Sequence, residues 1–325
     1  MEEWDPAIVK LFSIFMPTTF ERRFAIKAYS RFVYYTTAED FFRILDREEV
    51  LFRSPRCMND HREIENGIMQ LQQWNNDTES SGSLVRALEA CMPGVWKEGL
   101  KKYHHWLPNL RAQSYVLSVS EHDPDENETG RLSLWRAFDK GATGVAVVVS
   151  VAPFMQMTDA LKAYPSPVAY WTRRQLYEEF DVVAHRVAAN KDFLSKLNKA
   201  ALTEMVFLML LFAATCSKHP GFQQEREWRV LTNPLLWPST RFTAHQDVIA
   251  GIPQTVYRLP LKNSPNEKLT GIELPELIDR VIIGPSSHAG PIRDAIVAQL
   301  AERNVADPGS KVIMSGIPVR ATGIG

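Results

Sequence analysis

Two carboxylates lie two positions apart in the segment from Glu225 to Arg229, which reads Glu-Arg-Glu-Trp-Arg. If this segment is a strand, Glu225, Glu227 and Arg229 share one face, because alternate residues of a strand point the same way. The two carboxylates repel each other, so one of them should hold its proton more tightly than a lone glutamate, although the neighbouring arginine offsets part of that repulsion. The pattern suits a general base beside a carboxylate that binds a hydroxyl or a developing cation. A solvent-facing, salt-bridged edge strand is the structural alternative.

Hydroxyl, aromatic and amide side chains in three other segments could complete such a site. Ser118 and Ser120 alternate along a strand-like run, so both hydroxyls face one side, where they could hold a polar ligand or a carboxylate. Trp135 lies in a short helical run and could stack on a planar ring. Asn59 and Asp60 form a strong turn that could cap the next helix, and for this pair the structural role is the better interpretation.

Stronger catalytic signatures do not occur in the sequence. It contains no P-loop, GxGxxG, GxSxG or HExxH motif. The cysteines Cys57, Cys91 and Cys216 are widely spaced, which argues against a zinc site or a disulfide framework and suits a reducing compartment. The adjacent His104 and His105 are a weak metal candidate, and no metal is expected.

The composition is that of an ordinary globular protein with balanced charge. Its 37 Lys and Arg residues face 38 Asp and Glu residues, and 45% of the chain is hydrophobic. The balance argues against coating of nucleic acid by bulk electrostatics, while a local basic patch remains open. The apolar run 200–216 is short for a membrane span and contains Glu204, so a buried core helix is the better interpretation. With an acidic N-terminus that does not read as a signal peptide, the protein is expected to be cytoplasmic and not membrane-bound.

The elements that must position these side chains are strand-like and helical runs without a regular βαβ rhythm. Strands are expected at 32–36, 50–52, 115–120, 144–149, 227–231, 255–259, 281–284 and 311–315. Helices are expected at 38–47 with Thr37 as N-cap, at 63–107 with a polar break near 75–83, and at 132–139, 173–217 and 290–303. This pattern predicts an α+β fold. We expect a single domain over 31–325, with a central mixed or antiparallel sheet flanked by helices, after an N-terminal helical extension over 1–30.

Several segments, taken in order, resemble the bacterial domain of unknown function 2971 family. The resemblance covers residues 32–320. Its segments are 34–36 with 42–45, 54–60, 117–121, 134–136, 141–148, 218–229, 281–285 and 315–320. The tightest is 218–229, where Lys-His-Pro-Gly-Phe runs into Glu-Arg-Glu-Trp-Arg. One departure is His61, which follows Asn59 and Asp60 where the family more often has a proline.

The order of these segments is also similar to that of ADP-ribosyltransferases, as an analogy of fold. Those enzymes carry Arg or His on an early strand, Ser-x-Ser or Tyr in the middle, and Glu on a late strand. The resemblance implies that Glu227 stabilises the oxocarbenium-like state of NAD⁺ cleavage, and that Glu225 orients or deprotonates the acceptor. The binding residues that it implies are Arg31, Tyr35, Thr36, Ser118, Ser120, Trp135 and Arg229. Of these, the serines would hold Glu227 and the ribose, the aromatic residues and Thr36 would line ring pockets, and Arg229 would meet a phosphate.

Three classes of function follow from these observations. The leading hypothesis is an NAD-dependent ADP-ribosyltransferase-like enzyme or NAD glycohydrolase, used as a toxin or in anti-phage defence. Its substrate would be a nucleotide or dinucleotide, NAD, and its acceptor a protein or nucleic acid. The second is a non-catalytic binding or regulatory module, because every proposed site element also has a structural interpretation. The third is a nucleic-acid-directed enzyme or binder, suggested by basic residues beside aromatic ones at 101–106 and 170–174.

Overall fold

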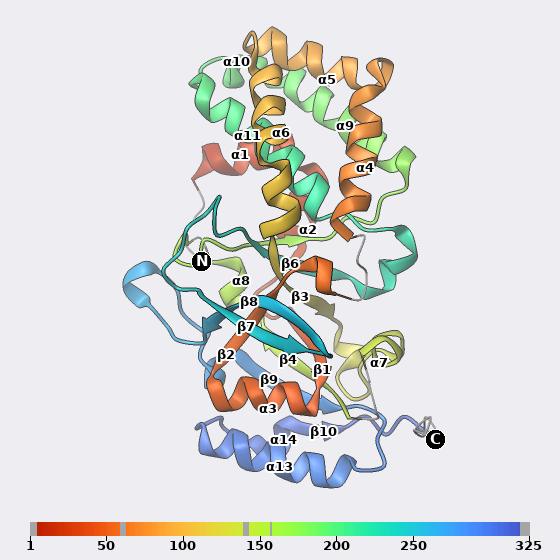
Figure 1. The fold of residues 1–325 in the computed structure, drawn as a ribbon, viewed down its shortest axis with the longest axis vertical. Helices are drawn as coiled ribbons and strands as arrows, with labels where there is room; N and C mark the ends of the chain where they lie inside the picture. The colour runs from red at the N-terminus through yellow and green to blue at the C-terminus, as the bar shows by residue number, and fades with distance from the viewer. Residues whose placement is uncertain (1–4, 59–62, 139–142, 157, 319–325) are drawn as a thin grey trace.

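The structure is a computed structural model that describes residues 5–58, 63–138, 143–156 and 158–318. A layer of helices lies at one end of the molecule, a sheet lies in the middle, and further helices cover the other end of the sheet (Figure 1). The fold is therefore α+β, with one open mixed sheet flanked by helices, as the sequence predicts. Within the described part of the chain, no helix has the length and apolar character needed to cross a membrane.

Within the described residues, ten strands form the sheet. They are β1 (Arg31–Thr37), β2 (Glu49–Arg53), β3 (Tyr115–His122), β4 (Gly144–Ser150), β5 (Tyr164–Pro167), β6 (Glu227–Thr232), β7 (Thr243–Ile249), β8 (Ile252–Pro260), β9 (Ile278–Ile283) and β10 (Val312–Met314). The α-helices are α1 (Pro6–Phe15), α2 (Pro17–Ala25), α3 (Ala38–Arg47), α4 (Glu63–Asn76), α5 (Thr78–Cys91), α6 (Val95–Gln113), α7 (Leu132–Phe138), α8 (Ala152–Met155), α9 (Arg173–Ala189), α10 (Lys191–Leu194), α11 (Lys199–Thr215), α12 (Leu274–Leu277), α13 (Ala289–Glu302) and α14 (Pro308–Lys311).

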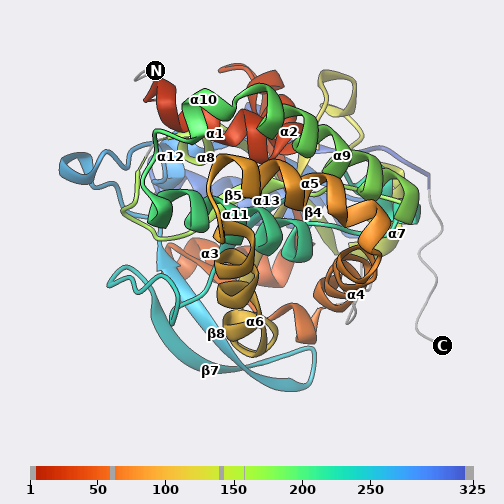
Figure 2. The same cartoon turned by 90° about the horizontal axis from the view of Figure 1, so that it is seen from above.

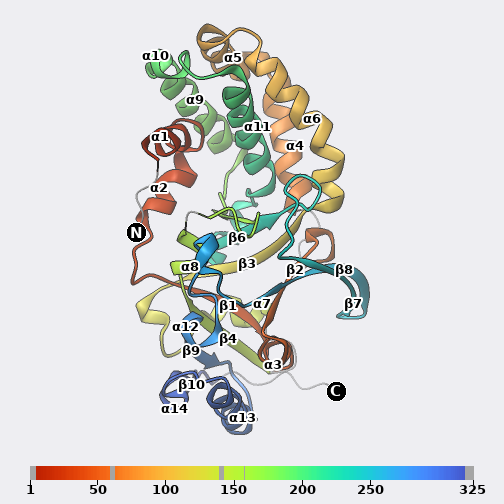
Figure 3. The ribbon, with the colours of Figure 1, turned by 90° about the vertical axis from the view of Figure 1, so that its left-hand side faces the viewer.

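Strand β3 is where the sheet divides into two branches. Along one edge it pairs with β6, which in turn pairs with the short strand β5. Along the other edge it pairs with β1 through Ser120 and with β2 through Val116. The β1 branch continues through β4, β9 and β10, and the β2 branch continues through β8 and β7. The two branches run to different sides of the molecule (Figure 3).

The helical layer covers the sheet at β3 and β6. Seen from above, α5, α6, α9 and α11 lie together over the sheet (Figure 2). Their common core includes the fully buried Trp74 and Phe207 and reaches Val116 and Leu231 on the sheet. Helix α11 is apolar on all sides, and most of its residues are buried, which confirms the interpretation of this run as a core helix.

The local signals in the sequence identify most elements correctly. Each predicted strand is present, and α3 begins as expected, with the Thr37 hydroxyl accepting a hydrogen bond from the Asp40 amide at 3.2 Å. The predicted break near 75–83 is too long, because Asp77 caps α5 by accepting from the Ser80 amide at 3.3 Å, and the serines continue the helix. The predicted helical region 173–217 consists of the three helices α9, α10 and α11, since Asn190 ends α9 and Asn198 begins α11.

Two strands were not predicted. Strand β7 is a largely exposed edge strand whose polar residues give no clear strand pattern. It is joined to β8 by a turn in which Ala250 and Gly251 have φ of 51° and 78°, values that tight hairpin turns use. Strand β5 has only four residues, two of them proline. The predicted turn at Asn59 and Asp60 lies outside the described residues, as do parts of the segments 141–148 and 315–320.

Candidate functional site

The carboxylate of Glu227, at the start of β6, is enclosed by hydrogen-bond donors. The Ser118 hydroxyl donates to its Oε1 at 2.6 Å. Arg229 donates from Nε to Oε1 at 2.9 Å and from Nη2 to Oε2 at 3.2 Å, and Lys218 Nζ lies 3.4 Å from Oε2. Burial alone would raise the pKa of Glu227, but the charges of Arg229 and Lys218 and the bonds from Arg229 and Ser118 lower it to about 2. Glu227 is therefore a buried group that is ionised at neutral pH.

Glu225 does not lie on the strand with Glu227. It ends a 3₁₀ turn, η3 (Pro220–Glu225), and the left-handed residue Arg226, with φ of 48°, separates this turn from β6. The prediction that Glu225, Glu227 and Arg229 share one strand face is wrong for Glu225. Lys218 joins the two carboxylates instead, with its Nζ 2.7 Å from Glu225 Oε2.

One of the two carboxyls is predicted to hold its proton more tightly than a lone glutamate, and Glu227 is not that one. Its pKa is lowered rather than raised, because two cations adjoin the carboxylate. Lys218 is 5% exposed and Arg229 is fully buried, so little water screens these attractions. Arg229 also donates from Nη1 to the carbonyl of Thr215 at 2.7 Å, which ties the network to the end of α11.

Most of the sheet residues predicted for the site share one face. Ser118 lies opposite Arg229, and Ser120 lies opposite both Glu227 on β6 and Val33 on β1. Tyr35 follows Val33 by two positions and so points to the same side. Ser120 is 8% exposed, and on this face α7 packs against β1 while Arg229 reaches the end of α11.

The predicted aromatic residues pack on each other. Tyr35 and Trp135 form an edge-to-face pair with ring centroids 4.8 Å apart. The Tyr35 hydroxyl accepts from the Arg131 amide at 2.7 Å, and the Trp135 indole donates to the Thr129 carbonyl at 2.8 Å. Trp135 is 2% exposed. In this arrangement both side chains are buried and contact each other.

The remaining predicted residues lie apart from the Glu227 network. Thr36 is buried and points to the opposite face from its neighbour Tyr35. Arg31, at the start of β1, donates from Nε to Asp279 at 2.9 Å, on β9 of the same branch. The structure thus brings Glu225, Glu227, Ser118 and Arg229 into one network. The other predicted residues either lie next to this network or lie apart from it.

One basic residue from each of the two aromatic-basic segments pairs with a glutamate of the helical layer. Lys102 on α6 pairs with Glu204 and lies over the ring of Phe207 at 4.6 Å. The neighbouring Tyr103 is 2% exposed. On α9, Arg174 pairs with Glu178 at 2.7 Å. A nucleic-acid partner stays a prediction from the sequence.

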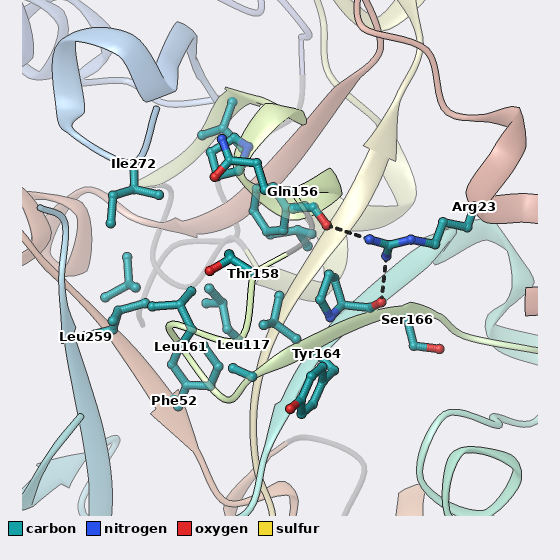
Figure 4. Close-up of a pocket in the computed structure, with 18 of the residues that line it drawn as sticks. Arg23, Phe52, Leu117, Gln156, Thr158, Leu161, Tyr164, Ser166, Leu259 and Ile272 are labelled. Carbon is teal, nitrogen blue, oxygen red and sulfur yellow. Dashed lines mark hydrogen bonds between the residues drawn. The ribbon is translucent and has the colours of Figure 1, made fainter. Parts of the chain in front are cut away.

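The opposite face of β3 and β6 borders a cavity of about 700 Å³. Leu117 and Val119 on β3 and Val230 on β6 point into it, alternating with the residues of the Glu227 network. The cavity extends between the two branches of the sheet, where side chains of β1, β2, β4 and β8 line it. Its sheet-side lining includes Tyr34, Val50, Phe52, Val147, Val149, Leu259, Ile272 and Leu274. Figure 4 shows several of these side chains converging on the space beside the segment 156–166.

Helices close the cavity on its other side. Phe12 of α1 and Phe20 of α2 line it together with Leu208 and Phe212 of α11. The charged residues of the lining are Arg23, Asp159 and Glu204. The cavity lining, within the described chain, includes none of the site residues predicted from the sequence.

Sequence reasoning missed both Lys218 as a member of the network and the cavity. Lys218 had a signal, because it is a lysine beside the apolar end of a core helix and near two glutamates. The sequence also held a signal for a layer on each side of the sheet. The strand Gly144–Ser150 is buried on both faces, so other elements must pack against each of them. The space itself had no local signal, because it arises where β1 and β2 diverge from β3.

Metal-binding groups and known proteins give few points of comparison for the Glu227 network and the cavity. Within the described residues there is no group of three or more His, Cys, Asp or Glu side chains that could hold a metal ion. No curated protein and no solved structure matches the chain. Residues 134–230, which include Trp135, Lys218, Glu225, Glu227 and Arg229, match the model of the family described as "Protein of unknown function (DUF2971)", and the resemblance to that family is confirmed over this stretch.

Proposed function

We propose that the protein binds an apolar small molecule in the cavity between the two branches of its sheet, and that it acts as a binding or regulatory module. The observation that carries this proposal is a space of about 700 Å³ kept open among mainly apolar side chains. Protein interiors are otherwise close-packed, with few voids larger than a water molecule. Sites for small molecules typically measure about 300–1,000 Å³ and combine apolar walls with a few polar groups.

The Glu227 network supports a ligand site less well than the cavity does. Glu227 is 4% exposed, and its carboxylate already receives hydrogen bonds from Ser118 and Arg229. A ligand would have to displace these donors before it could bind there. The cavity needs no such exchange, because its apolar walls gain from any apolar group that replaces water.

The uncharged fluorescent dye N-phenyl-1-naphthylamine tests the proposal, because its emission rises in apolar surroundings. We expect saturable binding to the full chain, and a large loss of binding when Leu117→Trp fills the cavity from the centre of β3. Val182→Trp is the matched control, since Val182 is 40% exposed on α9, away from the cavity. Leu259→Trp provides a second way to fill the cavity if the first variant folds poorly, as judged by circular dichroism.

Two results would contradict the proposal. One is the absence of saturable dye binding by the wild-type protein. The other is unchanged affinity in folded Leu117→Trp and Leu259→Trp, because a side chain enlarged in the cavity must compete with a ligand there.

NAD-dependent chemistry is a second candidate, as an ADP-ribosyltransferase-like enzyme or NAD glycohydrolase in toxin action or anti-phage defence. One observation favours it: Ser118 holds the Glu227 carboxylate at 2.6 Å, which is the role that the resemblance to ADP-ribosyltransferases implies for a serine. A ribose hydroxyl would reach Glu227 only after Lys218 moves aside, since its Nζ lies 3.4 Å from the carboxylate.

Consumption of NAD⁺ by the wild-type protein and by Glu227→Gln tests this candidate. We expect the variant to lose activity, because a neutral amide cannot stabilise a developing positive charge as a carboxylate does. Glu178→Gln, an exposed change on α9, serves as the control. No consumption by the wild type, or equal activity in Glu227→Gln, rejects the candidate.

A further inference from the structure

Arg23 brings a positive charge into the wall of the cavity. It lies in the last turn of α2, and its guanidinium donates to the carbonyl of Pro165 at 3.1 Å and to that of Phe154 at 3.2 Å (Figure 4). Burial of the guanidinium lowers the pKa of Arg23 to about 10, so it remains cationic at neutral pH. The two carbonyls, which carry no net charge, fix the orientation of the guanidinium beside the cavity.

The two acidic residues of the lining have cationic partners. Asp159 pairs with Lys162 at 2.7 Å and accepts a hydrogen bond from the Tyr164 hydroxyl at 3.2 Å. Glu204 pairs with Lys102. Neither lysine belongs to the lining. Because these pairs offset the acidic charges, the field of Arg23 favours an anionic group on its side of the cavity.

The cavity extends away from Arg23 as apolar space. In Figure 4 the guanidinium lies on one side, and Phe52, Leu117, Leu259 and Ile272 lie away from it towards the other side. These side chains come from β2, β3, β8 and the loop before α12, so the apolar space continues into the gap between the two branches. A hydrocarbon chain that starts at Arg23 would be buried along this direction.

An apolar entrance lies at α1 and α2. Ile8 is 38% exposed and Phe24 is 45% exposed, yet both also line the cavity. Phe24 is the neighbour of Arg23 in the sequence, so the charged residue lies near the entrance. This order, with apolar side chains at the entrance, a cation just inside and apolar space beyond, matches a molecule with a polar head and a long apolar tail.

We infer that the ligand of this cavity is a single-chain amphiphile with an anionic head, whose head binds Arg23 and whose tail lies between the two branches of the sheet. The inference rests on the proposed function, because it names the ligand class for the same cavity. A carboxylate and a phosphate both accept the paired hydrogen bonds of a guanidinium, so either head fits this chemistry. An uncharged amphiphile with the same tail would lack that interaction.

Displacement of N-phenyl-1-naphthylamine by three ligands with the same tail tests the inference. Tetradecanoate, tetradecyl phosphate and tetradecanol are titrated into the full chain at pH 7.5, below the concentration at which they form micelles. A hydrogen bond to a charged group contributes enough for about a 10- to 100-fold difference in affinity. We therefore expect one or both anions to displace the dye at concentrations lower by that factor than the alcohol, and the stronger anion identifies the head group.

Two variants separate the head from the tail. Arg23→Gln should remove the preference for the anions and leave the affinity for tetradecanol unchanged. Lys27→Gln is the matched control, since Lys27 is an exposed cation just beyond α2 that does not line the cavity.

The length of the ligand's tail tests the apolar part of the site. Shortening the tail should weaken binding by about fourfold for each methylene removed, as expected when each buried methylene contributes about equally.

The outcomes distinguish this inference from the proposed function. If the wild-type protein binds neither the dye nor any amphiphile, the proposed function fails. If it binds the alcohol as tightly as both anions, or if Arg23→Gln weakens alcohol and anion equally, the cavity still binds apolar molecules but the anionic head is refuted. A preference for anions that Lys27→Gln abolishes and Arg23→Gln leaves intact also overturns the role of Arg23.

Discussion

Replacing Glu227 by glutamine removes the charge at the centre of the buried network and nearly preserves the shape of the side chain. Arg229 is fully buried and Lys218 is 5% exposed, and both adjoin the Glu227 carboxylate. Removing one partner of a buried ion pair typically costs about 3–5 kcal/mol, because the remaining charge stays away from water. Lys218 keeps its pair with Glu225, so most of the loss falls on Arg229.

The lowered pKa of Glu227 gives a second estimate of the free energy that its charge contributes to folding. A fall from the ordinary value of 4.5 to about 2 corresponds to about 3 kcal/mol of folding free energy. Because the pKa is lower in the folded state than in the unfolded state, this stabilisation is fully present above about pH 4.5. It is lost as the pH falls from there towards 2, where the carboxylate of the folded protein takes up its proton.

Urea unfolding followed by circular dichroism measures this contribution in the wild type and in Glu227→Gln. At pH 7 we expect the free energy of unfolding to be lower in the variant by about 3 kcal/mol. The difference should shrink as the pH is lowered from 4.5, because glutamine does not titrate. Glu178→Gln breaks the exposed ion pair with Arg174 on α9 and should leave the urea midpoint of unfolding unchanged. Equal midpoints for the wild type and Glu227→Gln at pH 7, or a difference that does not depend on pH, would refute the reasoning.

Three further changes test how elements are held in place. Thr37→Ala removes the hydroxyl that caps α3 and should lower the free energy of unfolding by about 1 kcal/mol in the same urea experiment. In Gly67→Ala the new Cβ would lie 2.1 Å from the Ala214 carbonyl oxygen, so α4 must move from α11, and thermal melting should show a loss of about 1–3 kcal/mol. Gly290→Ala is its control, because nothing lies within 4 Å of that Cβ in α13, and it should melt no earlier than the wild type. Trp228→Ala removes a fully buried ring, and urea unfolding should show a loss of about 3–5 kcal/mol.

Features set by neighbouring residues could be predicted from the sequence. The cap at Thr37, the buried strand at 144–150 and the core helix at 199–215 each depend on a pattern within one element. The aromatic Trp228, which alternates with Glu227 and Arg229 along its strand, is fully buried in the sheet core. Such features need only the period of a helix or a strand and the preferences of caps.

Features set by where an element begins, or by distant partners, could not be predicted. The grouping of Glu225 with Glu227 assumed that the strand had begun by residue 225, whereas the left-handed Arg226 delays its start to Glu227. No strand period indicates that Lys218 turns back to meet both carboxylates. The cavity depends on the divergence of β1 and β2 from β3, which is decided by pairing between segments far apart in the chain.

The alternation along β6 explains how one strand supports two different environments. Glu227 and Arg229 point to the helical layer and form the ion network, and Trp228 and Val230 point to the other side, towards the sheet core and the cavity. A strand that carried only apolar residues could pair one position out of register at little cost. With charges on one face, a one-residue slip would place Glu227 and Arg229 among apolar side chains without their partners, at a cost of several kcal/mol. We infer that the network fixes the register of β6, and that this register in turn directs Val230 into the cavity.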